Sequence, residues 1–391
     1  MTTTFLIAWL AVQTVSVALV WIFTLGLGRS PALAHSPSVV VVVAVKGPDP
    51  EFEHFLAGLF AQDYATYRVI FAVEAADDPA VTQIATYQAR TPNRIALAVA
   101  GQSQDEGQKS ANLREALKQI APSDDVVVFA DANIRPGPDW LKRLVAPLVA
   151  GEADIVSGYA WVIPESNTLA AFVLTAMSHS LVAIPRLPLL NAAWGGSTAM
   201  TRACCERLDL DAAWRGTLSD DLQLTAVAQR EGCRIAAPRE VLLRSIVGPD
   251  GFRGLASEAV RWMLLFRVYM PTTFAIAMVA LTFTAAGWIA AVAGTIAGVP
   301  GAATVLLAAF GLMVLRTLGR AVIVARLWGK PGLVESRSFL LVDPLVAPIA
   351  AVTSAICGWL ALSSRHTTWA GITYRIDGPQ QVKVLARRRP S

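Results

Sequence analysis

Acidic side chains gather at three separated places in the chain, and their types and spacing suit them to chemistry. They are Asp77-Asp78, Asp131 with Asn133 two residues later, and Asp220-Asp221. Each group also has an ordinary structural explanation, because aspartates cap helix N-termini and Asp and Asn favour turns. One group alone would predict little, whereas all of them in order along one chain point to a shared site.

Carboxylates distributed in this way fit the transfer of a sugar from a nucleotide donor. The departing diphosphate needs a cation to neutralise its charge, and Asp131 with Asn133 can face a metal-bound diphosphate. The nucleoside needs hydrogen-bond acceptors, and the attacking hydroxyl needs a general base near the reacting carbon. Separate acidic sites in one domain can supply these needs.

The elements that must position these groups follow an alternating pattern. Strands are predicted at 38–45, 68–73, 94–99 and 125–130, and helices at 51–62, 79–90, 109–120 and from 219 onward. The first strand is mostly valine, which is typical of a strand buried on both faces. Strands that alternate with helices predict an α/β domain with an open, doubly wound sheet, whose ligands lie beyond the carboxyl ends of the strands. Glu74, Asp78 and Asp131 fall at or just after those ends.

Apolar runs on either side of this domain predict membrane helices. The chain is 54% hydrophobic and only 16% charged, below the ~25% charged residues of a soluble domain. Each run is close to the ~20 residues that an α-helix needs to cross a bilayer. The runs lie at 5–28, 272–298, 302–325 and 339–363. Ala32-Leu33-Ala34 resembles a signal-peptidase site, but the first run lacks the basic flank of a signal peptide, which favours an uncleaved anchor.

The chain is therefore predicted to have four parts. They are an N-terminal transmembrane anchor at 1–35, a cytoplasmic catalytic domain at 36–262, a transmembrane and interfacial region at 263–376 and a basic tail at 377–391. The soluble part contains no basic stripe with interleaved aromatic residues, so no nucleic-acid partner is expected. The four cysteines match no zinc motif and are interpreted as reduced structural residues.

The predicted site also restricts the topology. The apolar stretch 168–190 cannot be a span, because a single crossing would place Asp131 and Asp221 on opposite sides; we expect an interfacial helix that leads lipid to the site. The link 298–301 joins two helices in a hairpin, and an arginine-rich loop at 326–337 returns to the cytoplasm, as the positive-inside rule predicts. Asp343 within the last run favours a re-entrant or interfacial element.

An ordered series of short motifs gives the sequence a family resemblance over about 38–376. The series comprises Lys46-Gly47-Pro48-Asp49-Pro50, Asp77-Asp78-Pro79-Ala80, Lys109, Asn112, Asp131-Ala132-Asn133-Ile134-Arg135, Asp139, Ser178-His179, Gly195-Gly196-Ser197, Met200, Arg202, Asp220-Asp221, Arg261-Trp262, Trp369, Gly371, Tyr374 and Arg375. It resembles the ceramide glucosyltransferases, an inverting branch of the large family-2 glycosyltransferases. We expect a bacterial member.

The resemblance implies a nucleotide-sugar-binding mixed sheet of GT-A type and a role for particular residues. Asp221 would be the catalytic base on the acceptor hydroxyl. Asp131 would bind the diphosphate directly or through Mg²⁺ or Mn²⁺, with Asn133 as the second metal ligand. The full set of substrate-binding residues is predicted to be Glu74, Asp77, Asp78, Lys109, Asp131, Asn133, Gly196, Ser197, Asp220, Arg261, Trp262 and His179.

The sequence departs from the family pattern at two positions. Glu258 stands where the family has Gln or Arg three residues before Arg-Trp, and a carboxylate there cannot donate to phosphate. Asn133 replaces the second Asp of a strict Asp-x-Asp. His179 has two interpretations, a buried structural residue or, by resemblance, a residue at the lipid entrance.

The resemblance implies a hexosyltransferase that moves glucose, or another hexose, from a UDP-sugar to a membrane lipid such as ceramide. Transfer to a hopanoid or diacylglycerol is the alternative within the same chemistry. A non-catalytic membrane scaffold that retains the fold is the alternative of a different class. We expect an integral protein of the bacterial inner membrane. Because nucleotide sugars are made in the cytosol, we expect its catalytic domain to be cytoplasmic.

Overall fold

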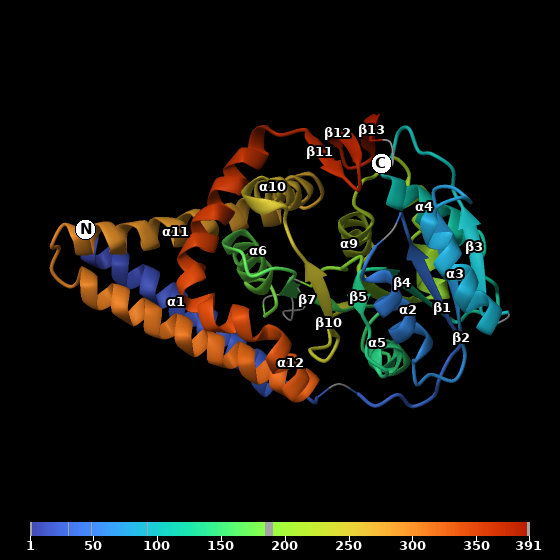
Figure 1. Cartoon of the computed structure of the whole chain (residues 1–391), viewed down its shortest axis with the longest axis horizontal. Coiled ribbons are helices and arrows are strands. Elements are labelled where there is room, and N and C mark those ends of the chain that lie inside the picture. Colours follow the sequence, from blue (N-terminus) through green and yellow to red (C-terminus); the bar gives the residue numbers. More distant parts are fainter. Residues whose placement is uncertain (1, 30, 48, 92, 184–190, 389–391) are drawn as a thin grey trace. The chain divides into compact units, whose positions relative to one another are not determined.

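The computed structural model describes residues 2–29, 31–47, 49–91, 93–183 and 191–388 (Figure 1). Pro48 of the first family motif, residues 184–190 of the predicted interfacial helix and residues 389–391 of the predicted tail lie outside this description. The chain divides into two compact units, each built from three stretches of sequence. The helical unit comprises Met1–Arg29, Val162–Ile184 and Ile246–Ser364, and the sheet unit comprises Ser30–Trp161, Pro185–Ser245 and Arg365–Ser391.

The sheet unit contains a mixed, seven-stranded sheet in the order β3-β2-β1-β4-β8-β6-β9. Its strands are β1 (Val39–Ala44), β2 (Tyr67–Val73), β3 (Ile95–Val99), β4 (Val126–Asp131), β6 (Ile155–Ser157), β8 (Ser197–Thr201) and β9 (Ile235–Ala236). The first four are parallel to one another, and β8 runs antiparallel to both β4 and β6. Ala44 pairs with Ala72 on one side and with Asp131 on the other, so the carboxyl ends of β1, β2 and β4 are level.

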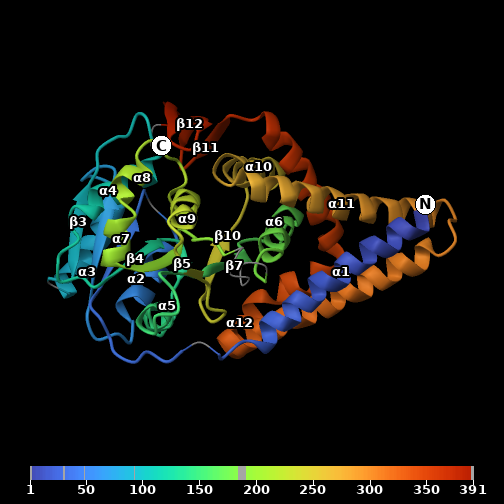
Figure 2. The same ribbon diagram turned by 180° about the vertical axis from the view of Figure 1, so that it is seen from behind.

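Helices cover both faces of this sheet, as the doubly wound prediction requires (Figure 2). They are α2 (Phe52–Phe60), α3 (Pro79–Arg90), α4 (Gln108–Leu117), α5 (Trp140–Val149), α7 (Arg202–Arg207), α8 (Leu210–Trp214) and α9 (Asp220–Arg230). Val39, Val41 and Val43 belong to the apolar core that contains α2, α3 and α5. Val40 and Val42 belong to the core that contains α4, α7, α8 and α9. The valine run of β1 is thus buried from both sides, because successive side chains of a strand point to opposite faces.

Two smaller sheets complete the strand arrangement. One has the order β5-β10-β7, formed by β5 (Ile134–Arg135), β7 (Tyr159–Pro164) and β10 (Leu242–Val247). The other is an antiparallel sheet within the sheet unit, in the order β11-β12-β13, and we call it the C-terminal sheet. Its strands are β11 (His366–Trp369), β12 (Ile372–Gly378) and β13 (Gln381–Arg387). The stretch 377–391, predicted as a basic tail, therefore contains a strand.

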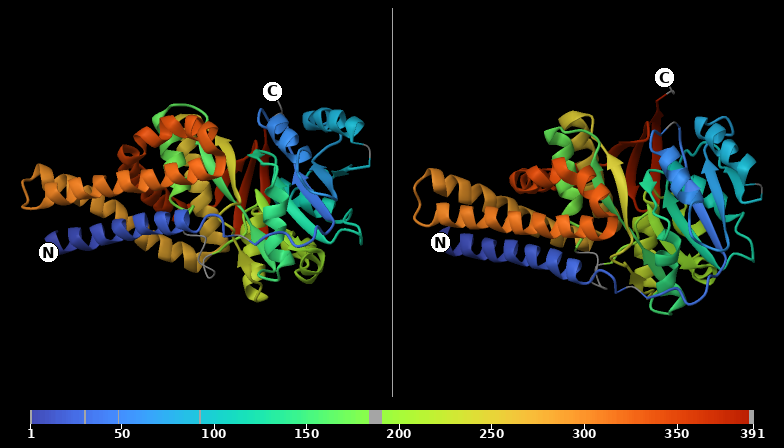
Figure 3. Two further views of the ribbon diagram at one scale, coloured as in Figure 1. Left: turned by 90° about the horizontal axis from the view of Figure 1, so that it is seen from below. Right: turned by 60° about the horizontal axis from the view of Figure 1, so that its bottom comes forward.

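The helical unit consists of α1 (Thr2–Leu25), α6 (Leu169–His179), α10 (Gly251–Tyr269), α11 (Pro271–Ile296) and α12 (Ala302–Ser363). Among the described residues, α1, α11 and α12 are long and apolar enough to cross a membrane. The predicted hairpin about 298–301 is confirmed, and α1 packs along α11 and α12 (Figure 3). A Cβ on Gly287 of α11 would lie 2.1 Å from the Trp9 ring of α1, so this contact requires glycine.

The loop predicted at 326–337 is wrong. Residues 302–363 form a single helical run that is interrupted only at Gly329 (φ 63, ψ −154). Glycine can adopt this positive φ without steric cost, and Pro331 fits the first turn of the helix that resumes, where an amide donor is not needed. The basic residues that suggested a loop therefore lie on a kinked helix.

The helix α6 occupies the part of 168–190 that the structure describes as regular. It has 11 residues, which is shorter than the ~20 needed to span a bilayer. Apolar side chains from α6, α10 and α12 form one core within the helical unit.

Candidate active site

The carboxyl ends of β1, β2 and β4 bring acidic and basic side chains to one edge of the sheet. Asp131 is the last residue of β4, and Glu74 follows β2. The helices α4 and α9 contribute Lys109 and the pair Asp220-Asp221 from their first turns. This edge is where ligands of open α/β sheets bind.

Lys109 forms the centre of this group. Its Nζ lies 2.7 Å from Asp131 Oδ1 and 3.1 Å from Asp220 Oδ1. Burial by itself would lower the pKa of Lys109, but the charges of the three nearby aspartates outweigh burial and raise that pKa above its ordinary value. We call Lys109, Asp131, Asp220 and Asp221 the Lys109 cluster. Its net charge is negative, because three carboxylates surround one ammonium group.

The two aspartates of α9 differ in environment. Asp220 is 3% exposed and pairs with Lys109. Burial raises the pKa of Asp220 to about 6, although the Lys109 ammonium opposes the rise. Asp221 is half-buried; the Ser219 hydroxyl and the Leu222 amide donate to its Oδ1, and the Gly195 amide donates to its Oδ2. Asp221 is therefore oriented by hydrogen bonds, without an ion pair of its own among the described residues.

The glycines before β8 allow the backbone to approach this cluster. A Cβ on Gly195 would lie 2.6 Å from Lys109 Nζ and 3.1 Å from Asp220 Oδ2, so a larger residue there would displace the ammonium. A Cβ on Gly196 would lie 2.2 Å from the Trp194 ring. Ser197 is fully buried and accepts a hydrogen bond from the Trp140 indole. The turn thus presents backbone amides, while Ser197 holds the turn in place.

The two residues of the predicted Asp77-Asp78 pair lie in different surroundings. Asp78 caps α3 by accepting from the Ala80 amide, and the same carboxylate accepts from the Gly47 amide at 3.0 Å. It therefore fixes the segment that follows β1 against the start of α3. Asp77 is exposed.

Glu74 lies in a basic setting that sequence reasoning missed. Lys46 Nζ lies 3.2 Å from Glu74 Oε2, and Arg387 Nη1 of the C-terminal sheet lies 2.8 Å from Oε1. Arg387 also donates to the Ser103 carbonyl and to Gln108 Oε1, the residue next to Lys109. The only sequence signal for Arg387 was its place in the terminal run of arginines.

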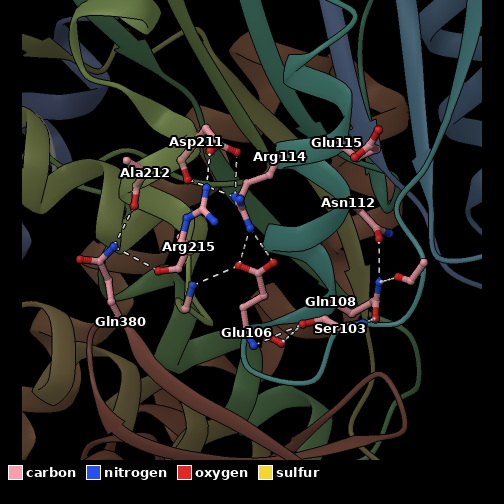
Figure 4. A network of polar contacts seen from close by, with 12 residues as sticks. Ser103, Glu106, Gln108, Asn112, Arg114, Glu115, Asp211, Ala212, Arg215 and Gln380 are labelled. Atoms are coloured by element: carbon pink, nitrogen blue, oxygen red, sulfur yellow. Dashed lines mark hydrogen bonds and ion pairs between the residues drawn. The ribbon is translucent and has the colours of Figure 1, made fainter.

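Further contacts fix the start of α4, the helix that carries Lys109 (Figure 4). Arg114 of α4 bonds both oxygens of Glu106 and the Asp211 carboxylate of α8. The side-chain amide of Gln108 donates to Gly101 O and to Asn112 Oδ1. The backbone amide of Gln108 donates to the Tyr374 hydroxyl of the C-terminal sheet. Gln380 donates to backbone carbonyls at and beyond the end of α8. The start of α4 is therefore held by both α8 and the C-terminal sheet.

Three predicted site residues belong to the helical unit. On α10, Glu258 Oε1 accepts hydrogen bonds from the Arg261 guanidinium and from Trp262 Nε1, the latter at 2.9 Å. The carboxylate that departs from the family pattern is thus a partner of the Arg-Trp motif. His179 is 3% exposed, its Nε2 lies 2.9 Å from Val162 O, and its ring meets Phe339 edge-on. Burial lowers the pKa of His179 to about 3, so its imidazole is neutral at pH 7.

The expected metal has two oxygen ligands available to it. Asp131 and Asn133 are both partly exposed, at the end of β4 and in the turn that follows. In the described part of the chain no three His, Cys, Asp or Glu side chains are grouped for a metal. One or two protein oxygens with substrate phosphate is nevertheless the usual arrangement for Mg²⁺ in nucleotide sites. The residues therefore fit a divalent cation that arrives with a diphosphate.

A sequence model of the family described as Glycosyl transferase family 21 matches residues 1–382. The chain belongs to this family. Membership confirms the glycosyltransferase chemistry implied by the motifs, and the mixed, parallel-rich sheet resembles GT-A glycosyltransferases.

One of the similar solved structures has a TM-score above 0.5 and shows the same fold. The mannosyltransferase PcManGT from Pyrobaculum calidifontis, in complex with GDP-Man and Mn²⁺, is 18% identical; the match covers 92% of this family 21 chain and 99% of that one, with a TM-score of 0.55. S. aureus TarS 1–349 is 11% identical over 90% of this chain and 100% of its own, with a TM-score of 0.38. Glucosyl-3-phosphoglycerate synthase from Mycobacterium tuberculosis is 17% identical over 59% and 79%, with a TM-score of 0.36.

Proposed function

We propose that this family 21 glycosyltransferase transfers a hexose, with glucose as the first candidate, from a UDP-sugar to a membrane lipid such as ceramide. The observation that carries the proposal is the Lys109 cluster. One ammonium group joins the carboxylate at the end of β4, suited to a metal-bound diphosphate, to Asp220, the first residue of the acidic pair that opens α9. The PcManGT complex with GDP-Man and Mn²⁺ supports a nucleotide sugar and a divalent cation as partners.

Asp221 is better suited than Asp220 to act as the general base. Asp220 is buried and its carboxylate is paired with Lys109. Asp221 is half-buried, and its hydrogen bonds come from neutral donors that orient the carboxylate, whereas the direct ion pairs of Lys109 go to Asp131 and Asp220. A base needs a free lone pair within reach of the acceptor hydroxyl. We therefore propose that Asp221 accepts the proton of the acceptor hydroxyl.

The transfer is a single displacement. The acceptor hydroxyl gives its proton to Asp221 as its oxygen forms a bond to the anomeric carbon of the sugar, and the bond from that carbon to the diphosphate breaks. UDP leaves and the anomeric configuration inverts. Asp131 and Asn133 would hold Mg²⁺ or Mn²⁺, which supplies positive charge to the departing diphosphate. The Lys109 ammonium is a second cation that can exchange a carboxylate partner for phosphate.

The nucleoside end of the donor is assigned to the ends of β1 and β2. Glu74 supplies acceptor atoms there, and Lys46 and Arg387 supply donors. The Asp78 carboxylate holds the Gly47 backbone beside them.

The lipid acceptor is assigned to the side of the membrane on which nucleotide sugars are made, so the sheet unit is proposed to lie in the cytoplasm, at the bacterial inner membrane. Hopanoid and diacylglycerol remain candidate acceptors.

Incubation of purified full-length protein with labelled sugar nucleotides and a lipid panel tests this proposal. The donors are UDP-glucose, UDP-galactose and GDP-mannose, and the acceptors are ceramide, diacylglycerol and a hopanoid, each with and without Mn²⁺. We expect a glucosylated lipid of inverted configuration that requires Asp221. Asp105→Asn alters an exposed carboxylate of the same unit and serves as the matched control. A scaffold without catalysis would give no product, and wild-type activity in Asp221→Asn would reject the assigned base.

A further inference from the structure

A buried ion cluster within the helical unit takes no part in the proposed reaction. Asp343 of α12 is fully buried, and it accepts hydrogen bonds at 2.7 Å from the Thr317 hydroxyl and from Arg320 Nη1. Arg316 Nη2 lies 3.7 Å from the same carboxylate. We call Arg316, Arg320, Thr317 and Asp343 the α12 cluster. Two guanidinium groups face one carboxylate, so the cluster carries one surplus positive charge.

Arg316 is the residue whose charge is left over. Asp343, which follows the kink at Gly329, already bonds Arg320 and Thr317, which precede it. The Arg316 side chain is 12% exposed, and its Nε is buried without a hydrogen-bond partner in the described part of the chain. The segments outside the described residues contain no Asp or Glu. A guanidinium cannot shed its proton in a protein, so this charge needs an anion that the chain does not supply.

The depth of Arg316 along the membrane helices indicates which anion can reach it. The Trp21 indole of α1 donates to the Leu315 carbonyl, and the Thr24 hydroxyl lies 3.5 Å from the Gly319 carbonyl. The last turn of α1 is therefore level with Arg316. The apolar helical span of 22 residues that ends at Leu25 extends about 33 Å at 1.5 Å per residue, close to the ~30 Å hydrocarbon core. Tryptophan at such a helix end is typical of the membrane boundary, where lipid phosphates lie.

We propose that the α12 cluster binds the phosphate of an anionic phospholipid through Arg316. A guanidinium matches phosphate oxygens in a bidentate arrangement, and the charge of Arg316 is the one left over after Asp343 pairs with Arg320. The flank of α12 beside Arg316 is open to acyl chains, since Val314, Leu315 and Leu318 are each about half exposed. The α12 cluster shares no residue with the Lys109 cluster, and the proposal does not depend on the donor or acceptor of the transfer reaction.

Lipid retention by the purified full-length protein tests the site. Wild type is delipidated in detergent, mixed with phosphatidylglycerol or phosphatidylcholine, and examined by native mass spectrometry and thermal unfolding. We expect wild type to retain phosphatidylglycerol, and Arg316→Gln to bind it about tenfold more weakly, the effect of one charge-assisted hydrogen bond. Lys330→Gln removes an exposed charge from the same helix and should bind as wild type does.

Further arms separate the possible explanations. Inorganic phosphate is added in place of lipid; stabilisation by phosphate alone, with no preference for phosphatidylglycerol, would reject a lipid site. If Arg316→Gln does not fold, Arg316→Lys takes its place in the comparison. It keeps the charge but loses the bidentate guanidinium, so it should bind phosphatidylglycerol more weakly than wild type, and equal binding would overturn the proposal. Equal retention of both lipids by wild type, or equal retention of phosphatidylglycerol by wild type and Arg316→Gln, would overturn the proposal.

Discussion

Replacing Lys109 with methionine removes the only cation of the Lys109 cluster while keeping a side chain of similar length. Three carboxylates then remain close together in a partly buried site. In wild type the ammonium lies 2.7 Å from Asp131 and 3.1 Å from Asp220. Two unit charges about 3 Å apart attract by about 5 kcal/mol at an effective dielectric constant of 20. Most of this attraction is offset by the free-energy cost of removing the ammonium from water. The methionine variant avoids that cost.

Removing one partner of a buried ion pair costs about 3–5 kcal/mol. The side chain of Asp131 is 31% exposed and that of Asp220 is 5% exposed. Water therefore screens part of the loss at Asp131, and we expect a value near the lower limit, about 3 kcal/mol. A unit of this size should then lose about 6–12 °C in melting temperature.

The loss should depend on pH in a definite direction. The pKa of Asp220 in wild type is about 6, raised by burial and opposed by Lys109. Without Lys109 that pKa rises further. A carboxyl whose pKa is higher in the folded state loses stability as the pH rises from its unfolded pKa through its folded pKa. The variant should therefore lie closer to wild type at about pH 5 than at about pH 8.

Thermal unfolding of the purified proteins in one detergent, at both pH values, measures this effect. Lys118→Met is the matched control, because Lys118 forms an exposed pair with Glu115, and such a pair contributes about 0–1 kcal/mol. A Lys109→Met variant as stable as the control, or one whose deficit is the same at both pH values, would refute the electrostatic account of the cluster.

Other expected outcomes concern the turn, the acidic pair and the Arg-Trp motif. Gly195→Ala should lower kcat/KM at least about tenfold, because a methyl group 2.6 Å from Lys109 Nζ must displace the ammonium. Wild-type kcat/KM should fall as the pH drops through about 6, when Asp220 gains a proton and its ion pair is lost, and Asp220→Asn should lack this limb. Glu258→Ala should lower kcat by removing the acceptor of the Trp262 indole, and Glu258→Gln should retain more activity because its amide oxygen can still accept.

Each of these outcomes has a control or a contrary result. Gly137→Ala changes a glycine with open space around its Cβ, so its activity should be unchanged. If it loses as much activity as Gly195→Ala, the steric argument is wrong. A pH profile of Asp220→Asn that matches wild type would assign the acid limb to another group. Equal activities of Glu258→Ala and Glu258→Gln would show that loss of the hydrogen bond to Trp262 is not the cause of the lower kcat.

Local sequence patterns predict most of the strands of the sheet and the helices that connect them. The valines of β1 alternate between two apolar cores, which a continuous β-branched run indicates without any tertiary information. Asp78 followed by Pro79 marks the start of α3 through capping chemistry. Parallel strands align their carboxyl ends, so Glu74 and Asp131 could be placed at one edge of the sheet.

Features that depend on distant partners could not be predicted in the same way. The ammonium of Lys109 meets Asp220 across more than a hundred residues, and Arg387 reaches Glu74 from a strand near the end of the chain. No local propensity encodes such contacts, because tertiary packing decides them. The loop expected at 326–337 failed for a related reason. Arginines near a membrane suggest a connection, whereas Arg320 on the preceding turns is neutralised by Asp343 after the kink.

The central claim is that Asp221 is the base of a sugar transfer whose donor binds at the Lys109 cluster. The most direct measurement compares wild type and Asp221→Asn in one preparation, for binding of the sugar nucleotide and for formation of the glycosylated lipid. For Asp221→Asn we predict nucleotide affinity close to wild type and product formation reduced about 10²–10⁴-fold, the contribution of a general base. Product formed by Asp221→Asn at the wild-type rate would contradict it.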